Sequence, residues 1–262
     1  MLRSADVTAE PSILHRREGD MAVLTLNRPD VLNAFSLEMV DRLLELLHQV
    51  RADGSRALLI NASGRAFCTG ADLRDPGART PRVLESHFNP LIQMIFALEL
   101  PVVAAVNGAA IGIGCSLALC ADLVLAGRSA FFQQSFANVG LAPDGGATWV
   151  LPRLIGRARA NAMLLTAERT PADLAERWGL IYRAVDDEAL LDRALEATER
   201  FATGPTRAYA LIRQGVHFAQ DATLEDALAQ EVRSQDAAFL TQDHAEAVAA
   251  IKERRIPQFR GC

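Results

Sequence analysis

Hydrophobic and polar residues alternate along the chain in two patterns, one typical of strands and one typical of helices. Four short apolar runs bounded by turn residues predict strands, at residues 22–27, 56–62, 102–108 and 122–127. Apolar side chains recur every three or four positions, as in amphipathic helices, at residues 36–50, 83–100 and 115–121. Ser36 is placed to cap the first of these helices, and Pro101 to end the second. Strands that alternate with helices predict βαβ crossovers and a mostly parallel sheet, so we expect an α/β fold.

The last part of the chain has a different pattern. From about residue 146 onward the apolar spacing is almost entirely helical, with segments at 157–166, 172–178, 188–202, 206–218, 223–240 and 243–254. Because this region has almost no strand signal, we expect it to cover the sheet or a partner subunit.

The composition limits the classes of function. Half of the 262 residues are apolar and 23% are charged, as in globular proteins. The net charge of −5 argues against a nucleic-acid-binding protein, because neutralising phosphates requires a basic surface. The first residues lack the apolar core of a signal peptide, and no apolar run reaches the roughly 18 to 20 residues that span a bilayer. The four cysteines form no CxxC pair and no histidine stands at metal spacing, so we expect a cytoplasmic protein with no metal site and no membrane contact.

Two glycine-containing segments follow predicted strands. The segment "VNGAAIGIGCS", residues 106–116, lacks the G-x-G-x-x-G spacing of a dinucleotide site and the lysine of a P-loop. By itself it fits either close packing of a helix on a strand or a backbone N–H site open to a ligand. The segment "GRAFCTGADL", residues 64–73, follows the strand at 56–62 in the same way. Two such loops at the same edge of a sheet can direct two N–H groups at one oxygen, which is the arrangement of an oxyanion hole.

Three segments resemble the successive signatures of the crotonase superfamily, the enoyl-CoA hydratases and isomerases: "LNRPDVLNAFS", "GRAFCTGADL" and "VNGAAIGIGCSLALCADL". The resemblance extends over about residues 12–258 and implies a crotonase-type spiral of ββα units with a helical C-terminal region. It implies a spiral core at residues 1–200 that binds acyl-CoA and a trimerisation region at 201–262. It also implies acyl-CoA thioester substrates, with coenzyme A as part of the substrate and no separate cofactor, and assembly as a homotrimer or a hexamer.

The same resemblance assigns roles to single residues. The two oxyanion donors would be the backbone N–H groups of Ala71 and Ile113, the latter standing where the family usually has glycine. Arg28 would bind the CoA phosphates, whereas Asp72 would mainly fix the first donor loop. The remaining expected substrate contacts lie in and around the two loops: Ala66, Gly70, Leu73, Gly112 and Phe136. Lys252 and Arg255 could reach the CoA of a neighbouring subunit.

The acid–base group distinguishes the reactions of the family. Hydratases of this superfamily use two glutamates, and Ser116 and Phe136 occupy the matching positions here. Asp144, in "LAPDGG", is either a helix N-cap or the catalytic carboxyl, since isomerases of the family place theirs in this turn. The surrounding segment is similar to that of the phenylacetyl-CoA ring-epoxide isomerases, and burial is expected to raise the pKa of Asp144. We therefore expect an isomerase that shifts a double bond. A hydratase or another lyase or hydrolase of this type, or a CoA-ester-binding subunit without activity, remain as alternatives.

Overall fold

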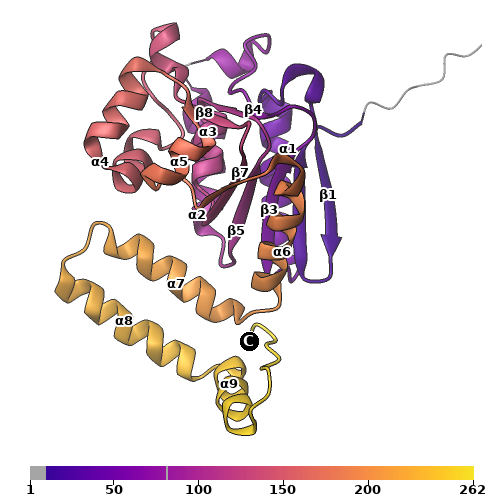
Figure 1. Cartoon of the computed structure of the whole chain (residues 1–262), viewed down its shortest axis with the longest axis vertical. Coiled ribbons are helices and arrows are strands. Elements are labelled where there is room, and N and C mark those ends of the chain that lie inside the picture. Colours follow the sequence, from indigo (N-terminus) through magenta and orange to yellow (C-terminus); the bar gives the residue numbers. More distant parts are fainter. Residues whose placement is uncertain (1–9, 81) are drawn as a thin grey trace, which may run out of the picture.

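The computed structural model describes residues 10–80 and 82–262, so the first nine residues considered above lie outside it. The strands of its main sheet are β1 Ile13–Glu18, β2 Met21–Leu26, β3 Ala57–Ala62, β5 Val102–Val106, β7 Leu123–Gly127 and β10 Arg183–Val185. They are arranged in the order β1-β2-β3-β5-β7-β10 (Figure 1). Only β1 and β2 pair antiparallel, and the other neighbours are parallel. The predicted α/β class with a mostly parallel sheet is confirmed.

A second sheet consists of four shorter strands: β4 Ala66–Cys68, β6 Ala109–Ile111, β8 Phe131–Gln133 and β9 Thr170–Pro171, in the order β4-β6-β8-β9. The chain moves from β3 to β4, from β5 to β6 and from β7 to β8, and enters a helical segment after each pair. Each turn of the chain therefore adds one strand to each sheet. This is the expected spiral of ββα units.

Helices cover both faces of the main sheet. Apolar side chains alternate between the faces, so that Leu24 and Ile60 belong to one core cluster and Val23 and Leu59 to another. The first cluster is completed by α1 Leu37–Ala52, α2 Asn89–Ala97, α3 Ile113–Leu119, α4 Ala147–Thr166 and α5 Ala172–Trp178. The second is completed by α6 Leu190–Ala202. Burial on both faces explains why the inner strands β2, β3 and β5 are largely apolar instead of alternating with polar residues.

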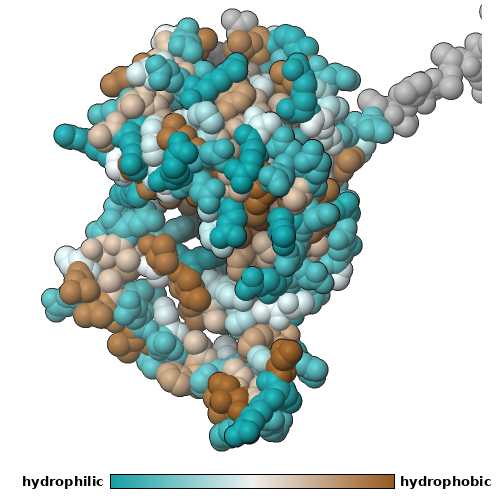
Figure 2. Space-filling model, viewed as in Figure 1, coloured by the Kyte–Doolittle hydropathy of each residue, from teal (hydrophilic) through white to brown (hydrophobic). Residues whose placement is uncertain are grey.

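The C-terminal helices pack differently from the rest. They are α7 Thr206–Ala219, α8 Leu224–Phe239 and α9 Gln242–Glu253, and they stand apart from the two sheets in Figure 1. No residue of α8 is buried. Large apolar side chains remain exposed on this region, and Figure 2 shows hydrophobic atoms gathered over the α7–α8 hairpin and around α9. The expectation that the region after residue 146 covers the sheet or a partner subunit is thus confirmed for the sheet by α4, α5 and α6, whereas α7–α9 leave an apolar surface uncovered.

Several predicted element boundaries were wrong. The helix predicted over 83–100 is a π-helical turn at Leu84–Phe88 followed by α2, which ends at Ala97. Beyond its end, Leu98 is extended, and the Arg213 guanidinium binds the carbonyls of Ile95 (3.2 Å) and Leu98. The helix predicted to begin at 157 begins at Ala147, with a kink at Gly156. Strand β1, the short strands of the second sheet and β10 were not predicted. No helix in the described part of the chain is long and apolar enough to cross a membrane.

Candidate active site

The first expected donor, Ala71, follows β4 in a loop bound to the segment that precedes α1. The Phe35 N–H donates to the Gly70 carbonyl (2.8 Å), and the Asp72 N–H donates to the Phe35 carbonyl (2.8 Å), so Phe35 and Ala71 form an isolated parallel bridge. In this parallel bridge Gly70 and Asp72 make the hydrogen bonds to Phe35. The N–H of a residue that lies between two such bonded residues points away from the partner strand. The Ala71 N–H therefore points away from Phe35, and the described residues offer it no hydrogen-bond acceptor.

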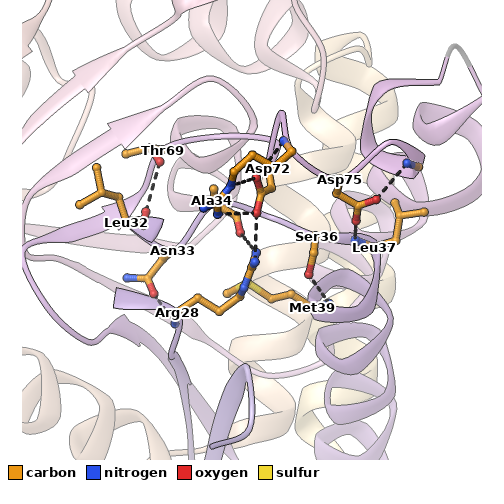
Figure 3. Close-up of polar contacts among 12 residues, drawn as sticks. Arg28, Leu32, Asn33, Ala34, Ser36, Leu37, Met39, Thr69, Asp72 and Asp75 are labelled. Carbon is orange, nitrogen blue, oxygen red and sulfur yellow. Dashed lines mark hydrogen bonds and ion pairs between the residues drawn. The ribbon is translucent and has the colours of Figure 1, made fainter. Parts of the chain in front are cut away.

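Two arginines bind the carboxylate next to this donor, and Figure 3 shows Arg28 pointing toward Asp72. Arg28 Nη2 lies 3.0 Å from Asp72 Oδ2, and Arg74 Nε lies 3.0 Å from Asp72 Oδ1. Arg28 also donates to the Ala34 carbonyl, which ties the loop to the segment before α1. Hydrogen bonds from Arg74 and then Arg28 hold the pKa of Asp72 well below its usual range. A carboxylate that stays ionised and fully paired is suited to fixing the loop, and not to exchanging a proton with a substrate.

The second expected donor, Ile113, is the first residue of α3. The N–H groups in the first turn of a helix have no acceptor within the helix, so this N–H is free to bind a ligand. Gly112, which precedes it, has a φ of 54° and a ψ of −127°, a conformation that strongly favours glycine. The Ile113 side chain is buried. A Cβ added to Gly145 would collide with Ile113 Cδ1, so this side chain packs under the turn that carries Asp144.

The two donor loops touch each other closely. A Cβ on Gly70 would lie 3.3 Å from the Ile111 carbonyl oxygen, and one on Gly114 would lie 2.5 Å from the Cys68 carbonyl oxygen. Glycine at these two positions therefore allows the start of α3 to pack against the end of β4. The close-packing interpretation of the segment at 106–116 is confirmed at Gly114, and binding of a ligand by the two N–H groups stays a prediction.

Asp144 lies in the turn that leads into α4. The Asp144 carbonyl accepts a hydrogen bond from the Ala147 N–H (3.1 Å), but the N-cap of α4 is Gly146 and no side chain caps this helix. The N-cap interpretation of Asp144 was therefore wrong. Its carboxyl oxygen Oδ1 is buried and has no hydrogen-bond partner. Burial raises the pKa of Asp144 from its usual 3.8 to about 6, in the direction expected from the sequence.

Comparison with known proteins shows the family to which this chain belongs. The family model described as enoyl-CoA hydratase/isomerase matches residues 16–262. This chain belongs to that family. The 1,2-epoxyphenylacetyl-CoA isomerase of Escherichia coli is 42% identical to it over 257 residues, covering 95% of this chain and 98% of the relative. A Rhodobacter capsulatus protein named "Probable enoyl-CoA hydratase" is 43% identical over 244 residues, covering 92% and 95%.

Solved structures of the family superimpose closely on this fold. The enoyl-CoA hydratase of Mycobacterium smegmatis has a TM-score of 0.89 at 32% sequence identity, and the match covers 95% of this chain and 99% of that one. The crotonase-type architecture expected from the sequence is therefore confirmed over nearly the whole chain.

No carboxylate occupies either position at which hydratases of this superfamily carry glutamate. Ser116 is buried in α3, and its Oγ lies 3.2 Å from the Asp144 carbonyl oxygen. Phe136 is also buried, and its ring lies against Gly112, since a Cβ on Gly112 would be 3.7 Å from Phe136 Cζ. The space beside the second donor is thus filled by an aromatic ring and by the Asp144 turn.

The other residues expected to contact substrate have different surroundings. Ala66 is buried in β4, where its carbonyl accepts a hydrogen bond from Asn33, whereas Leu73 is largely exposed. Arg28 lies close to the first donor loop, but its guanidinium is bound to Asp72 and Ala34, so binding of a CoA phosphate by Arg28 stays a prediction. Arg255 is paired with Glu246 and Glu253 of α9, and its proposed reach to a neighbouring subunit likewise stays a prediction.

Asn33 is a structural residue of the site that the sequence did not reveal. It is fully buried with a φ of 55°, and its side chain bonds the carbonyls of Ser63 (2.9 Å) and Ala66 (2.8 Å) and the Arg28 N–H (2.7 Å). It therefore connects the segment before α1 to the strand that leads into the first donor loop. Asparagine adopts this left-handed conformation more readily than most residues, which was the available signal.

The thiols near the donor loops are buried in the core. Cys68 and Cys115 are fully buried, and burial raises the pKa of each to about 12. Both side chains are small residues packed within the main core cluster. Within residues 10–80 and 82–262, no group of three or more His, Cys, Asp or Glu side chains is arranged to hold a metal ion.

Proposed function

We propose that this protein is an isomerase of unsaturated acyl-CoA thioesters in which Asp144 transfers the proton. The observation that carries the proposal is the environment of the Asp144 carboxyl, which is partly buried, has an unpartnered Oδ1 and has its pKa raised to about 6. Such a group is largely ionised at pH 7 and is a stronger base than an ordinary aspartate. It lies on a turn that packs against the residue supplying the second donor N–H.

The proposed reaction needs one carboxyl and two N–H donors. With a 3-enoyl-CoA, Asp144 removes a proton from C2, next to the thioester carbonyl, and the electron pair moves to the thioester oxygen to form a dienolate. The N–H groups of Ala71 and Ile113 stabilise that oxyanion more than the neutral carbonyl. Asp144 then returns the proton to C4, the double bond moves to C2–C3, and the thioester carbonyl re-forms. Atoms and charge balance without another reactant.

Hydration is the second candidate, because one close relative bears the name of a hydratase. Addition of water needs groups that hold and deprotonate a water molecule while a second proton is delivered to carbon. Ser116 and Phe136 supply no carboxylate for this purpose. A lone carboxyl in a poorly solvated position therefore favours proton transfer within the substrate over addition of water.

Absorbance separates the two reactions. A conjugated 2-enoyl thioester absorbs in the near ultraviolet, so an isomerase given 3-hexenoyl-CoA should produce that absorbance. Crotonyl-CoA should keep its absorbance, because only a hydratase removes it. We expect Asp144→Asn to abolish the gain from 3-hexenoyl-CoA while the affinity for the thioester stays within about threefold. Asp192→Asn, an exposed substitution on α6, is the matched control and should keep wild-type turnover. Turnover of 3-hexenoyl-CoA that survives in Asp144→Asn would refute the proposal.

The acyl group is proposed from the relatives. One relative is named 1,2-epoxyphenylacetyl-CoA isomerase and shares 42% of its residues with this chain. A ring-derived CoA thioester is accordingly the first substrate to compare with straight-chain enoyl-CoAs. A kcat/KM at least tenfold higher for the ring thioester would assign this enzyme to aromatic-acid breakdown, and the opposite ranking would assign it to straight-chain acyl-CoAs.

The uncovered helices support assembly into a homotrimer or a dimer of trimers. Leu224, Leu228 and Val232 of α8 are all more than half exposed, and they are spaced four residues apart, so they share one helix face. Burying such a stripe against another copy removes apolar surface from water. Leu228→Glu with Val232→Glu should lower the molar mass in light scattering to that of the monomer. An unchanged mass would contradict this role of α8.

A further inference from the structure

One buried hydroxyl lies between the two halves of the candidate site. Ser116, in α3, is only 3% exposed. Its Oγ is 3.3 Å from the Gly112 carbonyl oxygen and 3.2 Å from the Asp144 carbonyl oxygen. These acceptors belong to segments 32 residues apart in the sequence, one at the start of α3 and one in the turn before α4. The single hydroxyl proton is therefore shared between the two segments.

The first acceptor controls the direction of a donor N–H. The Gly112 carbonyl and the Ile113 N–H belong to the same peptide group, which is planar, so fixing the oxygen fixes the N–H on the opposite side. The Ser116 N–H donates to this oxygen as well, at 3.0 Å. Hydrogen bonds at a carbonyl oxygen also polarise the peptide and make its N–H a better donor. Ser116 thus acts on the group expected to bind the thioester oxygen.

The second acceptor belongs to the residue that carries the expected acid–base carboxyl. A Cβ added to Gly145 would lie 2.7 Å from Ser116 Cβ, so the turn rests directly on this serine. The φ of 58° at Gly145 adds a second reason for glycine at that position. Packing by Gly145 and the hydroxyl contact at Asp144 together hold the turn against α3.

A helical serine or threonine commonly bonds the carbonyl four residues before it, and this alone means little. Thr198 of α6 is fully buried and makes such a bond to the Ala194 carbonyl at 2.7 Å. The structure gives Ser116 what Thr198 lacks, a second acceptor from a distant segment. Thr198 is consequently a matched control for the loss of a buried helical hydroxyl outside the site.

We propose that Ser116 is a positioning residue whose hydroxyl holds the Asp144 turn and the Ile113 N–H at a fixed separation. The proposal rests on the proposed function, in which these two groups act on one substrate. Ser116 occupies the position of a hydratase glutamate and so removes an acid from the site. Its hydroxyl also connects the turn that carries Asp144 to the peptide that carries the Ile113 N–H.

The test compares Ser116→Ala, Ser116→Cys and Thr198→Ala with the wild type. Alanine removes the hydroxyl, whereas cysteine fills the same volume but is only a weak donor. We expect both Ser116 variants to lower kcat for 3-hexenoyl-CoA about tenfold with KM changed less than about twofold, since neither variant changes a residue expected to bind the CoA portion. We also expect faster amide hydrogen exchange in peptides covering residues 141–151 of the substrate-free protein. Thr198→Ala should change neither quantity.

Two outcomes would overturn the inference. Wild-type kcat in Ser116→Cys would mean that the site needs the volume of residue 116 and not its hydroxyl. Unchanged exchange over residues 141–151 in both Ser116 variants would mean that the hydroxyl does not hold the turn. The exchange experiment needs no substrate and decides the role of Ser116 even if the wild type fails to convert 3-hexenoyl-CoA. That failure would refute the proposed isomerase instead.

Discussion

Replacing Asp144 with asparagine should make the folded protein more stable at alkaline pH. Burial raises the pKa of this carboxyl from 3.8 to about 6 in the folded protein, and unfolding returns it to its usual value. Asp144 therefore does not lower the free energy of unfolding below about pH 4, where it is protonated in both states. The free energy of unfolding falls as the pH rises from about 4 through about 6, because the folded protein resists ionisation of this carboxyl. Full ionisation costs the folded state about 3 kcal/mol for this difference in pKa. Because the carboxyl is only partly buried, solvent screening reduces the expected gain in Asp144→Asn to about 2 kcal/mol.

Urea unfolding followed by tryptophan fluorescence measures this effect. The free energy of unfolding of Asp144→Asn should exceed that of the wild type by about 2 kcal/mol at pH 8, and the difference should nearly vanish at pH 4. All samples need the same protein concentration, because assembly would also change the apparent stability. Asp192→Asn should show no comparable dependence on pH. A difference for Asp144→Asn that is equal at the two pH values would show that the carboxyl is well solvated, and the argument for its basicity would fail.

Three further experiments test other parts of the site. Ile113→Pro removes the second donor N–H at a first-turn position that tolerates proline, so kcat should fall about 100-fold or more, while Ile113→Gly, which keeps the N–H, should remain active. Ser116→Glu combined with Phe136→Glu should not produce a hydratase, because the Asp144 turn occupies the space beside residue 116; consumption of crotonyl-CoA by this variant would contradict that reasoning. Arg28→Ala should lower the free energy of unfolding in urea by about 1–3 kcal/mol, because Asp72 loses a buried partner. Stability equal to the wild type would mean that Arg74 alone satisfies Asp72.

The longer elements were predictable because burial of their side chains produces a recognisable pattern of apolar residues in the sequence. Strands buried on both faces are continuous apolar runs, and α1 repeats its apolar side every three or four residues with Ser36 capping it through the Met39 N–H. Strands such as β4, β6 and β8 are three residues long, too short for any period to appear. Their existence is decided by pairing with segments that lie 22 to 43 residues away in the chain. The Ile95 carbonyl near the end of α2 is likewise bound by Arg213, which is distant in sequence.

The candidate site was predicted unevenly for a related reason. The two donor loops and the Asp144 turn carry local sequence signatures, so resemblance located them. The ion pair of Arg28 with Asp72 and the contact of Ser116 with Asp144 join residues that are far apart in the chain. No local pattern reports such contacts. The sequence therefore presented Arg28 as a free cation and Ser116 as a missing acid, whereas in the folded protein each one holds another residue in place.

The spiral places the three groups proposed for proton transfer after successive strands of the second sheet. Ala71 follows β4, Ile113 follows β6, and Asp144 follows β8 and the turn Ser135–Val139. Strand pairing positions the first two groups, and packing of the turn on α3 positions the third. Asp72, Arg74 and Asp75 bind the first donor loop and the start of α1. The described residues between Asp75 and α2 pair with neither sheet, so this part of the connection can differ in length without changing the strand pairing.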